Sequence, residues 1–225
     1  MTNIGWGYDV SSDPHFAYHT PAGLLPFGIE AAIGYAPNTQ DGAGNSYKST
    51  GAVGDASQDG SNATQYQITA KPIDGLTIGA DYYETGGDKL STISQEKTGG
   101  NIFAQYAIGN FKVGYNMGFY EPGLIAKDTA VTKYENTAYG IEVAVNDSLS
   151  LSYNEEKSEA ETSPAIADSA SGRVKTHVEA EMDTVQIAYV SGGATVGFHQ
   201  SETKNADYSA AKDEKVTLFT IAMEF

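Results

Sequence analysis

The sequence predicts an all-β protein, in which a single antiparallel, up-and-down β-barrel of about 10 to 12 strands crosses a membrane. Three observations lead to this fold class. Apolar and polar side chains alternate with a period of two residues along most of the chain. The segments that connect these stretches are alternately short and long. The chain ends in one more alternating stretch, whose last residue is Phe225.

The clearest alternating stretch is 111–120, where Phe111 and Val113 fall on one face of a strand and Lys112 and Asn116 fall on the other. No helix would keep these two sets apart. The same pattern recurs along the chain, stronger in some stretches than in others. In chain order, the expected strands are 15–20, 27–35, 64–70, 76–83, 101–108, 111–120, 139–145, 149–154, 185–190, 194–200 and 216–225.

The polar face of these strands consists mostly of Gly, Ala, Ser, Thr, Asn and Gln, with a few carboxylates. Small residues suit the inside of a curved, closed wall, whereas the outer face of a soluble sandwich is usually rich in Lys, Glu and Thr. Aromatic side chains lie near the strand ends on the apolar face, which suits the aromatic girdles at a membrane surface. The alternative is that aromatic residues simply favour strands.

The connections between the expected strands follow a regular order of short and long. Gly, Asn and Asp favour tight hairpin turns, and they are frequent in the short connections at 71–75, 109–110, 146–147 and 191–193. The long connections are polar and occupy 37–63, 86–97, 121–133, 161–177 and 205–214. Short turns at one end and long loops at the other are typical of membrane barrels. Residues 155–170 have a helix-favouring composition but no apolar stripe, so we expect a loop there.

The chain carries a formal net charge of −16 and contains no cysteine. An acidic balance argues against nucleic acid as a partner, because binding to phosphates needs a basic surface. No hydrolase, zinc-peptidase or nucleotide-loop motif is present, so we expect neither an enzyme nor a bound cofactor or metal. Two alternatives stay open, which are a calcium ion in the loop at 55–62 and divalent bridging to lipopolysaccharide at 155–161.

The last strand carries the most specific signal. Phe219, Ile221, Met223 and Phe225 alternate with residues that face the other way, up to the end of the chain. This pattern resembles the C-terminal strand of bacterial outer-membrane proteins, which the barrel-assembly machinery reads as an insertion signal. Residues 14–36 resemble a hairpin of alphaproteobacterial-type general porins that follows the constriction loop.

The resemblance to porins implies a channel for passive diffusion of small hydrophilic solutes and ions in the outer membrane of a Gram-negative bacterium. It also implies a homotrimer in contact with outer-membrane lipid and lipopolysaccharide. Two functions of other classes stay open. One is a non-conducting barrel that acts as an adhesin or structural anchor, and the other is a soluble secreted β-barrel that binds a ligand.

We expect one domain over residues 1–225. Ten expected strands start at or after residue 27 and the stretch 15–20 adds an eleventh, while residues 4–10 form either a twelfth strand or, within 1–14, the end of a constriction loop. Porins of the general type have about 16 strands. The chain is therefore either a self-contained barrel of about 12 strands or the C-terminal portion of a larger one, because eleven strands alone would leave open edges in lipid.

The alternation also assigns the side chains that face the lumen. The pore-lining candidates are His19, Glu30, Asp81, Tyr83, Lys112, Asn116, Glu142 and His199. With Glu224 included, carboxylates on this face outnumber the single base Lys112, so we expect the pore to prefer cations. The same alternation places Glu181 and Asp183 on the lipid face. Either these strands rise above the apolar band, or a bulge shifts their register.

Overall fold

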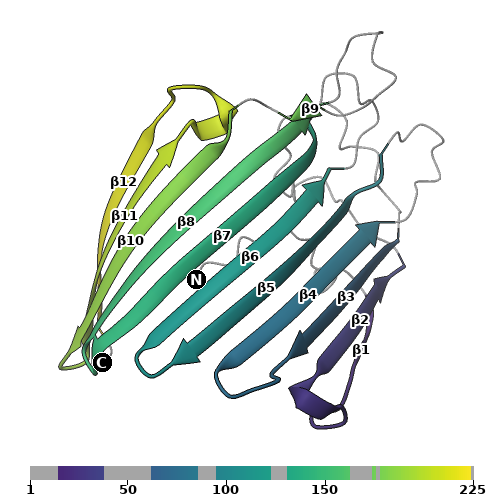
Figure 1. Ribbon diagram of the computed structural model, residues 1–225, viewed down its shortest axis with the longest axis horizontal. Coiled ribbons are helices and arrows are strands. Elements are labelled where there is room, and N and C mark those ends of the chain that lie inside the picture. Colours follow the sequence, from purple (N-terminus) through teal and green to yellow (C-terminus); the bar gives the residue numbers. More distant parts are fainter. Residues whose placement is uncertain are drawn as a thin grey trace.

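The computed structural model describes residues 15–37, 62–85, 95–122, 131–162, 174–175 and 178–223, and this part of the chain is all-β apart from two short 3-10 turns (Figure 1). No helix in these ranges is long and apolar enough to cross a membrane. The elements are β1 (Phe16–His19), η2 (Pro26–Gly28), β2 (Glu30–Ala36), β3 (Ala63–Ala70), β4 (Leu76–Thr85), β5 (Thr98–Ile108), β6 (Phe111–Glu121), β7 (Val131–Asn146), β8 (Leu149–Thr162), β9 (Val174–Lys175), β10 (Ala180–Ser191), β11 (Ala194–Lys204), η4 (Ala206–Tyr208) and β12 (Glu214–Met223).

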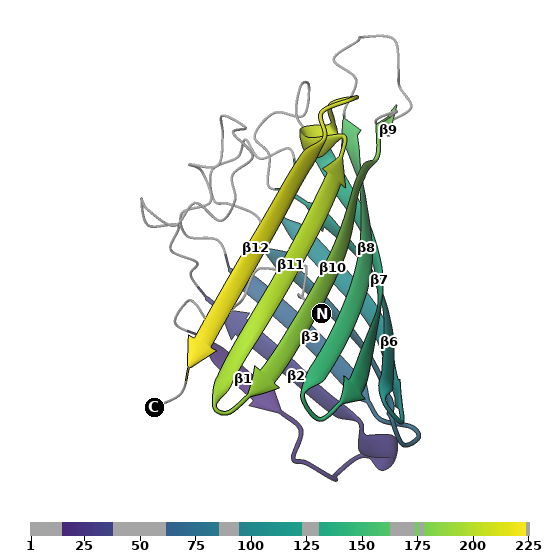
Figure 2. The ribbon, with the colours of Figure 1, turned by 90° about the vertical axis from the view of Figure 1, so that its left-hand side faces the viewer.

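The strands form one antiparallel sheet, in which eleven strands lie side by side in chain order and the short β9 pairs with the end of β8 outside this path. The prediction of an all-β, up-and-down arrangement is therefore confirmed. As far as the described residues show it, the sheet is curved but not closed, and β1 and β12 form its opposite edges (Figures 1 and 2). Closure into a barrel stays a prediction. The strand or loop end expected at 4–10, within 1–14, lies outside the described residues.

Most strands are longer than the alternation predicts, and β7 and β8 exceed the prediction by the most. β7 has 16 residues and β8 has 14 residues, so the first part of the loop expected at 155–170 is a continuation of β8. The added part of β8 is charged, and its side chains bind across the strands. Lys157 Nζ lies 3.3 Å from Glu179 and 3.0 Å from Glu181. Cross-strand ion pairs thus accompany strand pairing where the apolar pattern ends.

The second strand begins later than expected. β2 starts at Glu30, whereas Phe27 lies in the turn η2 with a φ of 57°. Pro26 cannot donate a hydrogen bond to a neighbouring strand, and its fixed φ favours a turn. The N–H of Ile29 donates to the carbonyl of Pro26 and closes this turn. The apolar alternation in the sequence therefore begins before the strand itself does.

The shortest connections are tight turns at residues 109–110, 147–148 and 192–193. Gly109 has a φ of 54°, in the left-handed region that primed hairpin turns require and that glycine adopts at little cost. Asn146, expected within a turn, is instead the last residue of β7. Its Oδ1 accepts hydrogen bonds from the N–H groups of Ser148 and Leu149 at 2.9 and 3.0 Å, which closes the hairpin.

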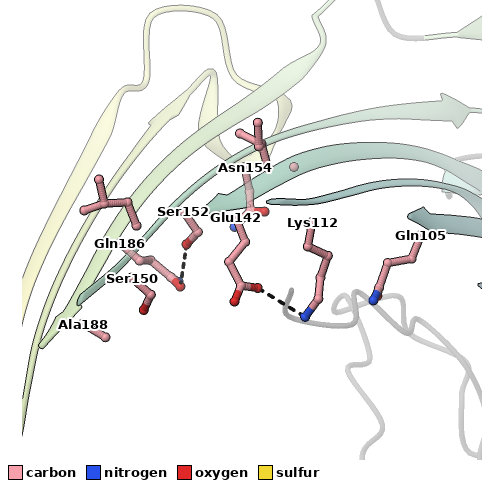
Figure 3. A pocket seen from close by; sticks show the side chains of 11 residues that line it. Gln105, Lys112, Glu142, Ser150, Ser152, Asn154, Gln186 and Ala188 are labelled. Carbon is pink, nitrogen blue, oxygen red and sulfur yellow. Dashed lines mark hydrogen bonds and ion pairs between the residues drawn. The ribbon is translucent and has the colours of Figure 1, made fainter. Parts of the chain in front are cut away.

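The two faces of the curved sheet differ in composition and in exposure. Large apolar side chains are exposed from β1 to β12 on the convex face, for example Phe111 at 51% and Ile221 at 68%. The polar side chains on alternate positions point to the concave face (Figure 3). Few hydrophobic residues of the described ranges are buried, and these are Ala36, Ala63, Tyr83, Tyr134, Ala160 and Ala206.

The convex face has an apolar band next to the short turns and a charged band next to the long links. On β8 the change occurs between Tyr153 and Glu155, and on β10 it occurs between Val185 and Asp183. β10 pairs with β8 and with β11 in a continuous register through this region. No bulge therefore moves Asp183 or Glu181 to the other face in these strands. They rise above the apolar band instead.

Candidate functional site on the concave face

The strand register places all eight pore-lining candidates on the concave face. Directly opposite residues of antiparallel neighbours share one face of a sheet. Lys112 lies opposite Glu142, and the same row continues through Ser152 and Gln186 to His199. Equivalent rows connect the remaining candidates, which are His19, Glu30, Asp81, Tyr83 and Asn116. Their role in lining a pore stays a prediction.

A hollow of about 410 Å³ lies on this face over β5 to β10. The polar side chains that line it include Gln105, Lys112, Glu142, Ser152, Asn154 and Gln186 (Figure 3). Gly140 also lines the hollow and lies opposite Gly114 on β6. A Cβ atom at Gly140 would collide with the Oδ1 of Asn154. A substitution at this glycine would therefore displace the side chain of a neighbouring strand.

The charged and polar groups of the hollow contact one another. Lys112 Nζ lies 3.4 Å from Glu142 Oε2, with the two side chains 42% and 44% exposed. The Ser152 hydroxyl donates to Gln186 Oε1 at 3.3 Å, and Gln186 Nε2 lies 3.1 Å from His199 Nδ1. This row offers hydrogen-bond donors and acceptors side by side to a solute in the hollow.

Three further candidates lie above this row, toward the long links. Asp81 accepts a hydrogen bond from Asn101 Nδ2 at 3.4 Å. Tyr83 is buried, and its ring lies against Gly99, where a Cβ atom would collide with it. Asn116 is half-buried. The structure therefore brings Lys112 and Glu142 together, but it does not bring these residues into their cluster.

The other predicted residues lie away from the hollow. Glu30 and His19 are exposed and belong to β2 and β1, at one edge of the sheet. Of the predicted assembly-signal residues, Phe219, Ile221 and Met223 lie exposed on the convex face of β12. Phe225 and Glu224 lie outside the described residues.

Carboxylates predominate among the charged side chains of the strands on the concave face. They belong to Glu30, Asp81, Glu142, Glu156 and Glu214, while Lys112 is the one lysine that the described strands place on this face. Five negative charges and one positive charge give a net charge of −4 on this face. The loop expected at 155–170 excluded Glu156 from the sequence prediction, and the strand expected to begin at 216 excluded Glu214. Both omissions arose because the predicted strands were too short, whereas the alternation assigns both residues to the correct face.

Tyrosine rings form a layer at the upper end of the concave face, next to the long links. The rings of Tyr120 and Tyr134 are stacked with centroids 6.2 Å apart, and Tyr208 lies 5.9 Å from Tyr134. Tyr208 belongs to η4, and its hydroxyl lies 2.7 Å from Ser158 Oγ. Burial raises the pKa of the Tyr208 hydroxyl, so this group is neutral at physiological pH. The sequence predicts 205–214 as an ordinary polar link, and no signal in it shows that Tyr208 turns inward.

Within the described ranges, no group of three or more His, Cys, Asp or Glu residues is placed to hold a metal ion. The calcium alternative at 55–62 falls almost entirely on residues outside these ranges. The run at 155–161 lies in β8, where Lys157 is 3.7 Å from Glu155. Compared with known proteins, the chain matches no family model, and no curated protein is significantly similar to it.

Proposed function

We propose that this chain forms the wall of an outer-membrane channel through which small hydrophilic solutes and ions diffuse, with a preference for cations. The observation that carries the proposal is which face of the curved sheet is apolar and which is polar. In a water-soluble antiparallel sheet the apolar face packs on a core and the polar face meets water. Here the band of the convex face next to the short turns is exposed and apolar, whereas the concave face carries mostly polar and small side chains. Such a wall is stable when hydrocarbon covers its outside and water fills its inside.

The boundary between the two bands of the convex face supports a membrane surface at this level. The Tyr153 hydroxyl donates to Asp183 at 2.6 Å, and the Tyr139 hydroxyl donates to Glu155. Each ring lies in the apolar band, while each hydroxyl reaches a carboxylate of the charged band. Tyrosine favours this half-wet position at the surface of a membrane.

The charge of the concave face supports the preference for cations. A net charge of −4 lies on the described strands of this face, and a low-dielectric wall focuses such a field into the space that it surrounds. The hollow at Lys112 and Glu142 adds paired donors and acceptors that can replace part of the hydration shell of a passing solute.

The resemblance of residues 14–36 and of the last strand to porins supports the further parts of the proposal. These are a location in the outer membrane of a Gram-negative bacterium, recognition by the barrel-assembly machinery, contact with lipid and lipopolysaccharide, and association into a homotrimer. The exposed row of Phe219, Ile221 and Met223 on β12 is accessible to such machinery. We propose no enzymatic activity and no cofactor.

A non-conducting barrel that serves as an anchor or adhesin is the second candidate. The tyrosine layer favours it, because Tyr83 and Tyr134 are buried and their rings take up space on the concave side. The hollow lower on the same face favours a channel instead.

Reconstitution of the purified protein into planar bilayers tests the proposal. We expect discrete conductance steps and, across a KCl gradient, a reversal potential with the sign of potassium preference. Heat-denatured protein from the same preparation is the control for contaminating channels. Folded, heat-modifiable protein without conductance would support the anchor, and protein that stays monomeric without detergent would contradict a membrane location.

A further inference from the structure

The link between β11 and β12 folds back over the concave face. Residues 205–213 form this link, and Tyr208 reaches from it to Ser158 on β8 and to Tyr134 on β7. β8 and β7 lie two and three strands away from β11. With a spacing of about 4.8 Å between strands, the link and its side chain span roughly 10 to 15 Å of the sheet. Figure 2 shows this yellow segment at the upper end of the sheet.

Hydrogen bonds fix the link at both of its ends. The side chain of Asn205 donates to the carbonyl of Glu179 at 3.0 Å and accepts a hydrogen bond from the N–H of Ala211 at 3.2 Å. The N–H of Asn205 donates to Asp213 at 3.2 Å. Asn205 therefore connects the start of the link, its end and the chain that leads into β10.

The backbone of the link is held in an unusual conformation. Four of its non-glycine residues have a positive φ, and these are Asn205, Asp207, Tyr208 and Ala211. Such conformations are uncommon outside glycine and persist where the surrounding structure enforces them. Ala206 is buried, and Lys212 forms an ion pair with Asp207. The link is thus a compact, braced unit that presents Tyr208 to the sheet.

We propose that Tyr208 narrows the channel at its upper end and thereby limits the size of the solutes that pass. This inference rests on the proposed channel function. Tyr134 and Ser158 belong to the concave face, because their register partners Tyr120 and Asn136 do. A ring that lies over these two residues reduces the open cross-section of the proposed lumen. The partly buried hydroxyl contact with Ser158 and the tilted ring contact with Tyr134 hold that ring in place.

Tyr208→Ala tests the proposal by removing the ring while the strands stay unchanged. In planar bilayers we expect its single-channel conductance to exceed that of the unmodified protein by roughly 1.3- to 2-fold, because conduction depends on the width of the pore. In liposome-swelling assays with sugars of increasing size, the cut-off should move to larger sugars. Tyr208→Phe keeps the ring and loses the hydroxyl, so we expect it to conduct like the unmodified protein.

Asn205→Ala provides a second variant that keeps Tyr208 but removes the side-chain bonds that fix the link. We expect an intermediate gain in conductance with more frequent fluctuations. This variant decides the matter if Tyr208→Ala does not fold. Folding of each variant is checked by heat-modifiable mobility in gel electrophoresis.

Thiol labelling gives a readout that does not depend on conductance, because the chain contains no cysteine. A water-soluble maleimide should react several-fold faster with Ser158→Cys when Tyr208 is also replaced by Ala. Ser152→Cys lies on the same strand and face but away from Tyr208, so its rate should be the same in both backgrounds.

The outcomes separate this inference from the proposed function. Channels whose conductance and size cut-off are unchanged in both Tyr208→Ala and Asn205→Ala would overturn the role of Tyr208 and leave the channel standing. Absence of any channel in the unmodified protein would overturn both. A labelling rate at Ser158→Cys that is insensitive to Tyr208→Ala would overturn the inward position of the ring.

Discussion

Lys112 and Glu142 show how a single pair of residues controls the charge that the concave face presents. Each is directly opposite the other on neighbouring strands, and their charged groups lie 3.4 Å apart. Both remain partly exposed, so the pair contributes little to stability by itself. In the proposed channel each charge largely cancels the field of the other at a passing ion, so the loss of either charge changes the field in the lumen.

This pairing predicts opposite effects for two conservative substitutions. Glu142→Gln leaves the ammonium group of Lys112 without its partner, so the preference for potassium over chloride should fall. Lys112→Gln leaves the carboxylate of Glu142 without its partner, so the preference should rise. Reversal potentials across a KCl gradient measure both changes. The field of a charge extends over about 10 Å at 0.1 M salt but only about 3 Å at 1 M, because salt screens it. Both effects should therefore shrink at high salt.

Asn116→Gln is the matched control, because it changes another polar side chain on the same strand and face as Lys112 without a change in charge. A shift in the same direction for Lys112→Gln and Glu142→Gln would contradict the assignment of these residues to the ion path. So would a loss of potassium preference in the control.

The facing of single residues could be predicted from the sequence, but their contacts could not. Side chains alternate strictly along a strand, and this fixes one face for Asp81, Lys112 and Glu142 without any knowledge of the fold. The row that joins Lys112 to Glu142 depends on the register between two strands, which the alternation within one strand does not contain. Tyr208 lies outside a strand altogether, so no periodic signal indicates its position.

At the scale of elements, the convex face of each strand has two parts with different surroundings. On β3, Ile68 lies in the apolar band, opposite Ala31 and Ala80. Thr64 lies on the same face and strand, but in the charged band, opposite Glu84. If hydrocarbon covers only the apolar band, the same substitution should have very different effects at these two positions.

Lysine at each position tests this difference. Ile68→Lys should lower the free energy of unfolding from lipid vesicles by about 2 to 4 kcal/mol, the cost of a cation that faces the bilayer near its centre. Thr64→Lys should change it by less than about 0.5 kcal/mol, because the new ammonium group meets water and Glu84. Urea titration in vesicles, followed by tryptophan fluorescence or circular dichroism, gives both values. Equal, small effects at both positions would indicate that water covers the whole convex face.

The extent of the elements could be predicted only where apolar alternation continues. β6 begins at Phe111, as expected, because its apolar positions extend from the turn almost to its end. β8 continues past Tyr153 into charged residues, where ion pairs such as Lys157 with Glu181 accompany the pairing. A sequence pattern based on hydrophobicity cannot distinguish such a segment from a polar loop. At η2 the opposite error occurs, since Phe27 continues the pattern into a turn that Pro26 imposes.

For the whole molecule, the number of strands restricts how the sheet can close. In the part of the chain that the structure describes, eleven strands follow one another in antiparallel order, so β1 and β12 run in the same direction. Direct contact between them would create a parallel pair in an otherwise antiparallel wall. Antiparallel closure requires an odd number of further strands between these edges. Open edges in hydrocarbon are costly, because each unpaired backbone group loses its hydrogen bond.

We therefore expect that β1 and β12 do not pair with each other in the folded protein, and cysteine pairs can test this in a chain that has no cysteine of its own. Phe198 and Phe219 lie opposite each other on β11 and β12, with ring centroids 5.1 Å apart. A double substitution of these two residues by Cys should form a disulfide under mild oxidation, because directly opposite positions bring the Cβ atoms close enough.

Tyr18→Cys combined with Phe219→Cys or Ile221→Cys should not crosslink, although all of these positions lie on the exposed convex face of edge strands. Intact mass and gel mobility before and after reduction report each bond. Efficient crosslinking between position 18 and β12 in folded protein would mean that the eleven strands close on themselves, and it would contradict the requirement for antiparallel closure.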